Sequence, residues 1–141
     1  MICTFFGHRD CSENVREKLR KSIVGLIEND SVDTFYVGEQ GNFDRLVHAE
    51  LKELKKQYPT IKYTIILAYH PATRQGRTSE ECDTLFPEIP GNVLPRYAID
   101  KRNQWMIEKA DYVITYVRHV TGGAAKFREK AIKKGKIVID I

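Results

Sequence analysis

The stretch YVITYVRHVTGGAAKFRE, which runs from Tyr112 to Glu129, joins an apolar run to a basic helical segment through a turn that contains two glycines. Its first part, Tyr112–Val117, is nearly continuous in apolar residues, and such runs are typical of strands buried on both faces of a parallel sheet. Four more runs of strand length occur along the chain, at Ile2–Phe6, Thr34–Val37, Tyr63–Ala68 and Lys136–Ile141. The sequence therefore predicts five strands, most of them parallel.

Helical periodicity fills most of the segments between these runs. Apolar residues recur at helical spacing over Glu13–Asn29, Phe43–Tyr58, Arg96–Ala110 and Gly122–Lys134. Strands that alternate with helices predict an α/β fold, a Rossmann-like three-layer sandwich in which helices cover both faces of a mostly parallel five-stranded sheet. A length of 141 residues fits one domain, so we expect residues 1–141 to form a single domain.

One connection is longer than the others. Residues 69–95 are rich in turn-forming residues and too long for a plain connector in a compact domain. Two interpretations stay open, a lid over a ligand site and a disordered surface insertion.

Composition limits the classes of function. Hydrophobic residues make up 42% of the chain and charged residues 30%, as in ordinary globular domains. The formal net charge of +4 attracts small phosphorylated ligands but is weak for a nucleic-acid-binding protein, so we do not expect nucleic acid as a partner. The three cysteines argue against a disulfide framework and a zinc site, and we expect no metal and no cofactor. Because no apolar stretch has the length of a membrane span, we expect a cytoplasmic protein without membrane contact.

The turn after the strand at Tyr112–Val117 is a candidate anion site. Ligands of open parallel sheets bind beyond the carboxyl ends of the strands. Thr121 is predicted to cap the last helix, and Gly122 and Gly123 leave backbone N–H groups accessible at its positive end, where a phosphate or carboxylate fits. The alternative is that the glycines serve only a tight turn or close helix packing.

The turn after the first strand carries Gly7, His8 and Arg9. The planar guanidinium of arginine suits phosphate, and an imidazole can donate a hydrogen bond or move a proton. The alternative is that Arg9 pairs with Asp10 or Asp44 and that His8 bonds only backbone.

The turn after the second strand adds Gly38, Glu39, Gly41 and Asp44. The two carboxylates are candidates for bonding ribose hydroxyls or polarising a reacting water. Asp44 also lies in the first turn of a helix, where the helix dipole favours a carboxylate without any ligand.

Arg102 and Asn103 add polar groups to the apolar stripe of the third helix. An arginine beside a buried stripe either extends to solvent or reaches the ligand crevice. A buried amide needs hydrogen-bond partners, and we expect those of Asn103 in the turn after the first strand or in the glycine turn.

Four motifs taken in order, TFFGHRDC, YVGEQGNFD, KRNQWMIEKADYVITYV and TGGAAK, resemble those of the SLOG superfamily, near its YspA/YpsA-like (DUF1273) group of small bacterial and phage proteins. The resemblance spans nearly the whole chain. It implies a Rossmann-like sheet with a nucleotide or nucleotide derivative bound at the strand ends.

The superfamily also contains the LOG phosphoribohydrolases, whose hallmark is PGGxGTxxE. Laid on TGGAAKFRE, the hallmark matches at Gly122, Gly123 and Glu129 and departs at Thr121, Ala125 and Lys126. The resemblance thus puts Glu129 at the position of a catalytic carboxylate. The alternative is an exposed glutamate paired with a neighbouring lysine of the same helix.

The main hypothesis is a module, and perhaps a sensor, that binds a nucleotide or nucleotide derivative. The first alternative is an enzyme that cleaves an N-glycosidic bond of a nucleoside monophosphate with the help of Glu129 or Glu39. The second is a DNA-associated protein, favoured by the basic last helix. Trp105 and Tyr97 are aromatic candidates for a subunit interface, so a homodimer is a further prediction.

Overall fold

The computed structural model describes residues 1–69, 83–89 and 93–141. Its centre is a six-stranded sheet in the order β4-β3-β2-β1-β5-β6, in which every neighbouring pair is parallel. The strands are β1 (Ile2–Gly7), β2 (Thr34–Val37), β3 (Lys62–Ile66), β4 (Asp83–Leu85), β5 (Tyr112–Tyr116) and β6 (Ile137–Asp140). The α/β class and the parallel sheet are confirmed.

The prediction of five strands was wrong, because β4 lies inside the stretch 69–95 that was expected to be a loop. All three residues of β4, Asp83–Leu85, are exposed, so the strand carries no buried apolar run. It forms because β3 offers an open edge, with Ile65 opposite Thr84. The question of a lid falls mostly on residues 70–82 and 90–92, outside the described residues.

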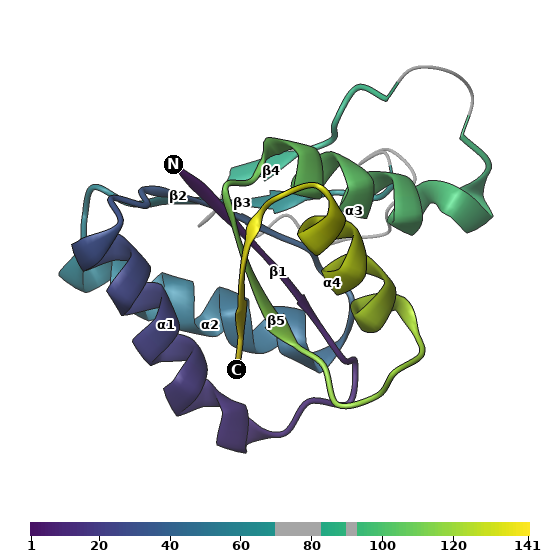
Figure 1. The fold of residues 1–141 in the computed structure, drawn as a ribbon. Coiled ribbons are helices and arrows are strands. Elements are labelled where there is room, and N and C mark those ends of the chain that lie inside the picture. Colours follow the sequence, from purple (N-terminus) through teal and green to yellow (C-terminus); the bar gives the residue numbers. More distant parts are fainter. Residues whose placement is uncertain (70–82, 90–92) are drawn as a thin grey trace.

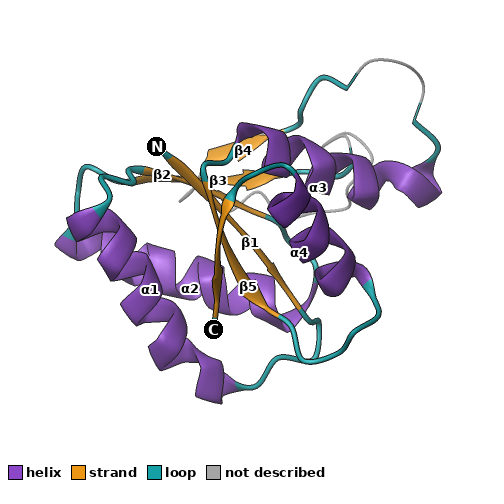
Figure 2. Ribbon diagram, viewed as in Figure 1, coloured by secondary structure: helices purple, strands orange, loops and turns teal. Residues whose placement is uncertain are grey.

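Four α-helices in the described part of the chain cover the two faces of the sheet. They are α1 (Arg16–Asn29), α2 (Gly41–Gln57), α3 (Ala98–Lys109) and α4 (Gly123–Lys133), and short 3₁₀ turns at Glu13–Val15 and Pro95–Tyr97 precede α1 and α3. Figures 1 and 2 show α1 and α2 together on one face and α3 and α4 on the other. The three-layer arrangement predicted from the sequence is confirmed.

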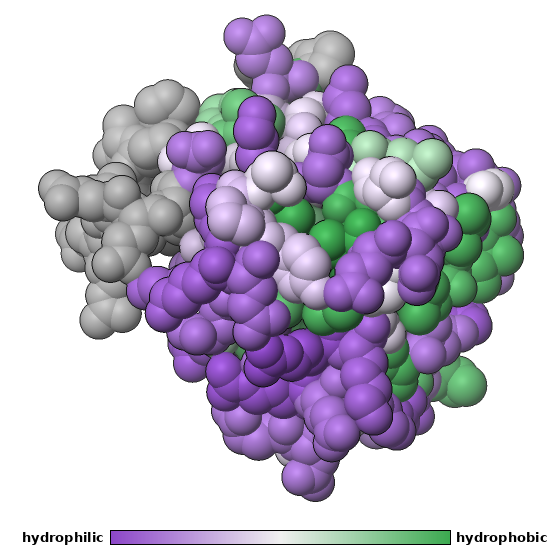
Figure 3. Space-filling model, turned by 90° about the vertical axis from the view of Figure 1, so that its left-hand side faces the viewer, coloured by the Kyte–Doolittle hydropathy of each residue, from purple (hydrophilic) through white to green (hydrophobic). Residues whose placement is uncertain are grey.

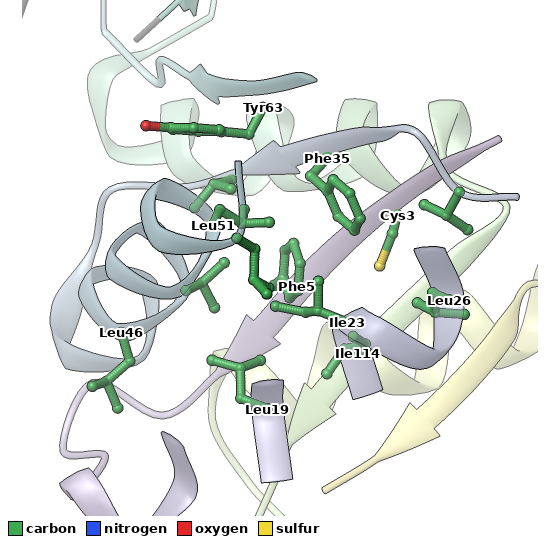
Figure 4. Close-up of a cluster of buried hydrophobic side chains, with 14 of the residues drawn as sticks. Cys3, Phe5, Leu19, Ile23, Leu26, Phe35, Leu46, Leu51, Tyr63 and Ile114 are labelled. Atoms are coloured by element: carbon green, nitrogen blue, oxygen red, sulfur yellow. The ribbon is translucent and has the colours of Figure 1, made fainter. Parts of the chain in front are cut away.

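Two apolar clusters lie on opposite faces of the sheet, because successive strand residues point to opposite sides. Phe5 stacks on Phe35 in the cluster under α1 and α2, which Figure 4 shows with Leu19, Ile23 and other buried side chains. The next residue, Phe6, stacks on Phe127 of α4 in the second cluster. Burial on both faces explains why the strands read as continuous apolar runs.

The surface is rich in polar residues. The side of the molecule that lies on the left in Figure 1 is mostly hydrophilic, with separate apolar areas among the polar side chains (Figure 3). No helix among the described residues is long and apolar enough to cross a membrane. Of the two aromatic interface candidates, Tyr97 is half-exposed, whereas Trp105 is partly buried against Tyr36. The homodimer stays a prediction.

Candidate ligand-binding site

A cavity of about 440 Å³ opens where β1 ends, between the turn after β1, the start of α2, α3 and the start of α4. It thus lies at the carboxyl end of β1, where the connections after β1 and β5 lead to helices on opposite faces of the sheet. This is the usual ligand position in open α/β sheets. The predicted site residues that line it are Gly7, His8, Arg9, Asp44, Arg102, Asn103 and Gly123. The turn after β1, Gln40 after β2 and the start of α4 after β5 therefore surround one space, whereas the predicted residues Gly38, Gly41, Thr121 and Gly122 lie outside its lining.

Two of the predicted glycines are required by packing around the turn after β1. A Cβ at Gly7 would overlap the ring of Phe43. Gly41 has a φ of +89°, and a Cβ there would lie 2.7 Å from the Cα of Arg9. The backbone N–H of Asn42 donates to the Arg9 carbonyl at 2.9 Å, which fixes this turn on the start of α2.

Gly38 lies between two groups of opposite charge. A Cβ at Gly38 would lie 2.7 Å from a carboxylate oxygen of Asp44 and 3.1 Å from the guanidinium of Arg102. The same Asp44 oxygen accepts a hydrogen bond from the backbone N–H of Gln40 at 2.8 Å. Burial raises the pKa of Asp44 to about 6, although the Gln40 bond and the charge of Arg102 act in the other direction.

Arg102 is a buried cation in the wall of the cavity, with an exposed fraction of only 2%. Its Nε donates to the side-chain oxygen of Asn103 at 3.0 Å, and another guanidinium nitrogen donates to the Ile66 carbonyl at 3.4 Å. It forms no ion pair with any residue that the structure describes. Burial lowers the pKa of Arg102, while the negative charges of Asp44 and Glu39 act in the other direction.

The partner expected for Asn103 was wrong. Its side-chain oxygen accepts from the adjacent Arg102 rather than from the turn after β1 or the glycine turn. Asn103 therefore holds the guanidinium of Arg102 in place at the cavity wall.

The glycine turn places the start of α4 against the cavity. Gly122 has a φ of +102° and is itself the N-cap, so the predicted cap at Thr121 was wrong and Thr121 is exposed. Gly123 and Ala124 line the cavity, and a Cβ at Gly123 would meet no atom within 4 Å. Packing thus does not require Gly123, and the N–H groups of this first turn are free of intrahelical partners.

Charged residues that the sequence analysis missed complete the wall, namely Asp10, Arg96 and Asp100. Lys126 of α4 pairs with Asp100 of α3 at 2.7 Å, which joins the two helices at the rim. Arg96 and Asp100 share a helical face with Asn103, so the spacing of 96, 100 and 103 was the available signal. Arg9 lines the cavity, and the structure shows no ion pair between it and Asp10 or Asp44, both of which it describes.

The two carboxylates predicted to be catalytic lie outside the lining of the cavity. Glu129 is exposed on α4 and pairs with Lys133 at 3.7 Å. Glu39 lies on the turn after β2, close enough to Asp44 and Arg102 for its charge to affect both. Within residues 1–69, 83–89 and 93–141, no group of three acidic, histidine or cysteine side chains is placed to hold a metal ion.

No protein-family model matches the chain. No curated protein matches its sequence either. In structure the chain is similar to DNA processing protein A from Streptococcus pneumoniae, with a TM-score of 0.73 and 18% sequence identity. The match covers 98% of this chain and 49% of that protein, so the chain spans about half of its length. At this identity the likeness shows the fold, a parallel α/β sandwich of the Rossmann-like type.

Proposed function

We propose that the cavity binds a nucleotide or nucleotide derivative and that the chain acts as a ligand-binding module. The observation that carries this proposal is Arg102, a buried guanidinium in the cavity wall that has no ion pair among the described residues. A buried charge is costly unless it is compensated. Asp44 and Glu39 offset part of this charge without a direct ion pair, and an anionic group of a ligand in the cavity would supply that pair.

The start of α4 supplies the second feature that favours phosphate. The backbone of Gly123 and Ala124 lines the cavity at the positive end of the helix dipole. Arg9 and Arg96 add exposed positive charge on other parts of the wall, and a guanidinium can donate two parallel hydrogen bonds to a phosphate.

Asp44 and the apolar wall favour a nucleotide over a bare phosphate. Since its pKa is about 6, Asp44 is ionised at pH 7 and can accept hydrogen bonds from sugar hydroxyls. The half-buried Ile99 and the buried Met106 and Phe127 form an apolar part of the lining, on which a base can lie. The resemblance of the sequence motifs to the SLOG superfamily supports the same ligand class.

The test is calorimetric titration with adenosine 5′-monophosphate and with adenosine, after a thermal-shift screen of common nucleotides. We expect Arg9→Ala and Gly123→Ala each to weaken the monophosphate more than the nucleoside. Gly25→Ala is the matched glycine control, because a Cβ there also meets no atom within 4 Å and lies on α1. The proposal fails if no nucleotide binds the wild-type protein, or if both cavity variants bind as the control does.

A second candidate function is cleavage of an N-glycosidic bond, and Asp44 is the observation that favours it. A carboxyl in a cavity with a pKa of about 6 is suited to proton transfer near neutral pH. Chromatographic release of free base from a nucleoside monophosphate, abolished in Asp44→Asn and retained in Glu129→Gln, would establish this activity. If a nucleotide stabilises the protein against unfolding and no base is released, the result supports the binding module instead.

DNA association is the third outcome to measure, since the protein of similar fold is by name a DNA processing protein. Fluorescence anisotropy with single-stranded DNA at two salt concentrations measures it directly. Binding that weakens steeply with salt would indicate contacts with several phosphates. We expect weak binding, because the net charge is only +4.

A further inference from the structure

His8 joins the turn after β1 to the segment 117–122, which connects β5 to α4. Its Nε2 lies 2.6 Å from the backbone nitrogen of Arg118 and 3.3 Å from that of His119. A backbone N–H can only donate, so Nε2 must be an unprotonated acceptor. His8 is therefore neutral in this arrangement and carries its proton on Nδ1.

The charged and titratable groups around His8 come from both turns. The His119 ring lies 4.8 Å from the His8 ring, and Tyr116 packs edge-on at 5.8 Å. Burial lowers the pKa of His8, the charges of His119 and Arg118 lower it further, and Asp10 opposes them. The surroundings thus favour the neutral form that the geometry requires.

The position of the segment 117–122 matters for the cavity because it ends at Gly122, the N-cap of α4. Gly123 and Ala124 follow at once and line the cavity beside His8 itself. The two hydrogen bonds to His8 consequently hold the segment 117–122, which leads to Gly123 and Ala124, against the end of β1.

We propose that neutral His8 is a latch for the segment 117–122 and that protonation of His8 opens it. An imidazolium would point an N–H at two N–H donors, so protonation and the two hydrogen bonds exclude each other. Because the latched state lowers the pKa of His8, the latch is stable above pH 6.5, the ordinary pKa of histidine. It weakens as the pH falls through the lowered pKa. Its opening should increase by at most about tenfold per pH unit.

The latch does not depend on any ligand, whereas its effect on affinity rests on the proposed function. Opening would displace the start of α4, so we expect nucleotide binding to weaken on acidification. Sulfate serves as a second probe, because its charge is constant from pH 7.5 to 5, whereas a phosphate monoester gains a proton near pH 6.

The experiment is amide hydrogen exchange by NMR on the full chain without ligand, from pH 7.5 to pH 5, expressed as protection factors. We expect the protection of Arg118 and His119 to fall with pH in the wild type. His8→Gln keeps a hydrogen-bond acceptor but cannot titrate, so its protection should be independent of pH. His119→Gln is the control and should retain the pH dependence.

NMR titration of the His8 ring gives an independent measurement on the wild type alone. The latch is refuted if the His8 pKa lies at or above 6.5, or if protection of the two amides stays constant while His8 titrates. Loss of pH-dependent protection in His119→Gln would assign the titration to His119 and overturn the proposal. Failure of sulfate and nucleotides to bind at any pH would refute the proposed function. The latch would then be tested by the amide hydrogen exchange alone.

Discussion

Replacement of Asp44 by asparagine isolates the cost of an ionised carboxylate in the cavity. Asparagine keeps an oxygen that can accept the backbone N–H of Gln40, which Asp44 now binds at 2.8 Å. Because the pKa of Asp44 is raised, the folded state holds this proton more tightly than the unfolded chain. The folded state is therefore favoured below the ordinary pKa of 3.8, and this advantage is lost as pH rises through about 6.

The size of the effect follows from the pKa. A rise from 3.8 to about 6 corresponds to about 3 kcal/mol of unfolding free energy at pH 7 if the carboxylate is fully shielded. Asp44 remains partly exposed at the cavity wall, so solvent screens its charge. We expect Asp44→Asn to be more stable than the wild type by about 1–2 kcal/mol at pH 7, and equal to it near pH 4.

The assay is urea unfolding of both proteins between pH 4 and pH 8, followed by circular dichroism. Glu129→Gln serves as control, since this carboxylate is exposed and should change stability by less than about 0.5 kcal/mol at any of these pH values. Parallel pH profiles of the wild type and Asp44→Asn would refute the reasoning. The reasoning would also be refuted if Asp44→Asn were less stable than the wild type at pH 7 while its unfolding free energy fell with urea concentration at the same slope.

Three further substitutions test packing and charge away from this carboxyl. Gly7→Ala should destabilise by about 1–3 kcal/mol in urea unfolding, because its Cβ overlaps the Phe43 ring, and Phe43→Leu in the same chain should recover part of the loss. Gly25→Ala should stabilise by up to about 1 kcal/mol, because it replaces a glycine within α1 without a clash. Hydrogen bonds from Arg128 and Thr115 lower the pKa of Asp140 to about 2, so its stabilisation is present above pH 3.8 and lost as pH falls towards 2. Asp140→Asn should therefore cost less than about 1 kcal/mol at pH 7, since the side chain is half-exposed, and less still as pH falls towards 2.

The sequence predicted most strands of the sheet because a strand that is buried on both faces has a continuous run of apolar residues. Phe5 and Phe6 point to opposite clusters, and both must be apolar. The strand at Asp83–Leu85 has no such apolar run, because its residues are exposed and it forms by pairing with the open edge of β3. An edge strand of three residues depends on its neighbour more than on its own sequence.

The position of the cavity could be predicted from a general rule for parallel sheets, but the side chains that line it depend on directions that the sequence does not give. The rule that ligands bind at the carboxyl ends of strands pointed to this cavity, which residues following β1, β2 and β5 line. Arg96 and Asp100 share the helical spacing of Asn103, but they were missed because the sequence alone does not say that this face meets the cavity. The cap at Thr121 was wrong because the positive φ of Gly122 places that glycine at the cap position.

The two cavity charges offer a way to determine how a ligand lies. Burial opposes ionisation of both Asp44 and Arg102, which face each other across Gly38 without an ion pair. A sugar hydroxyl that donates to Asp44 stabilises the carboxylate and lowers its pKa, whereas a phosphate beside it raises the pKa. NMR titration of the Asp44 carboxyl carbon with and without adenosine 5′-monophosphate distinguishes the two. A fall below 6 places the sugar at Asp44 and the phosphate at α4, and a rise places the phosphate at Arg102.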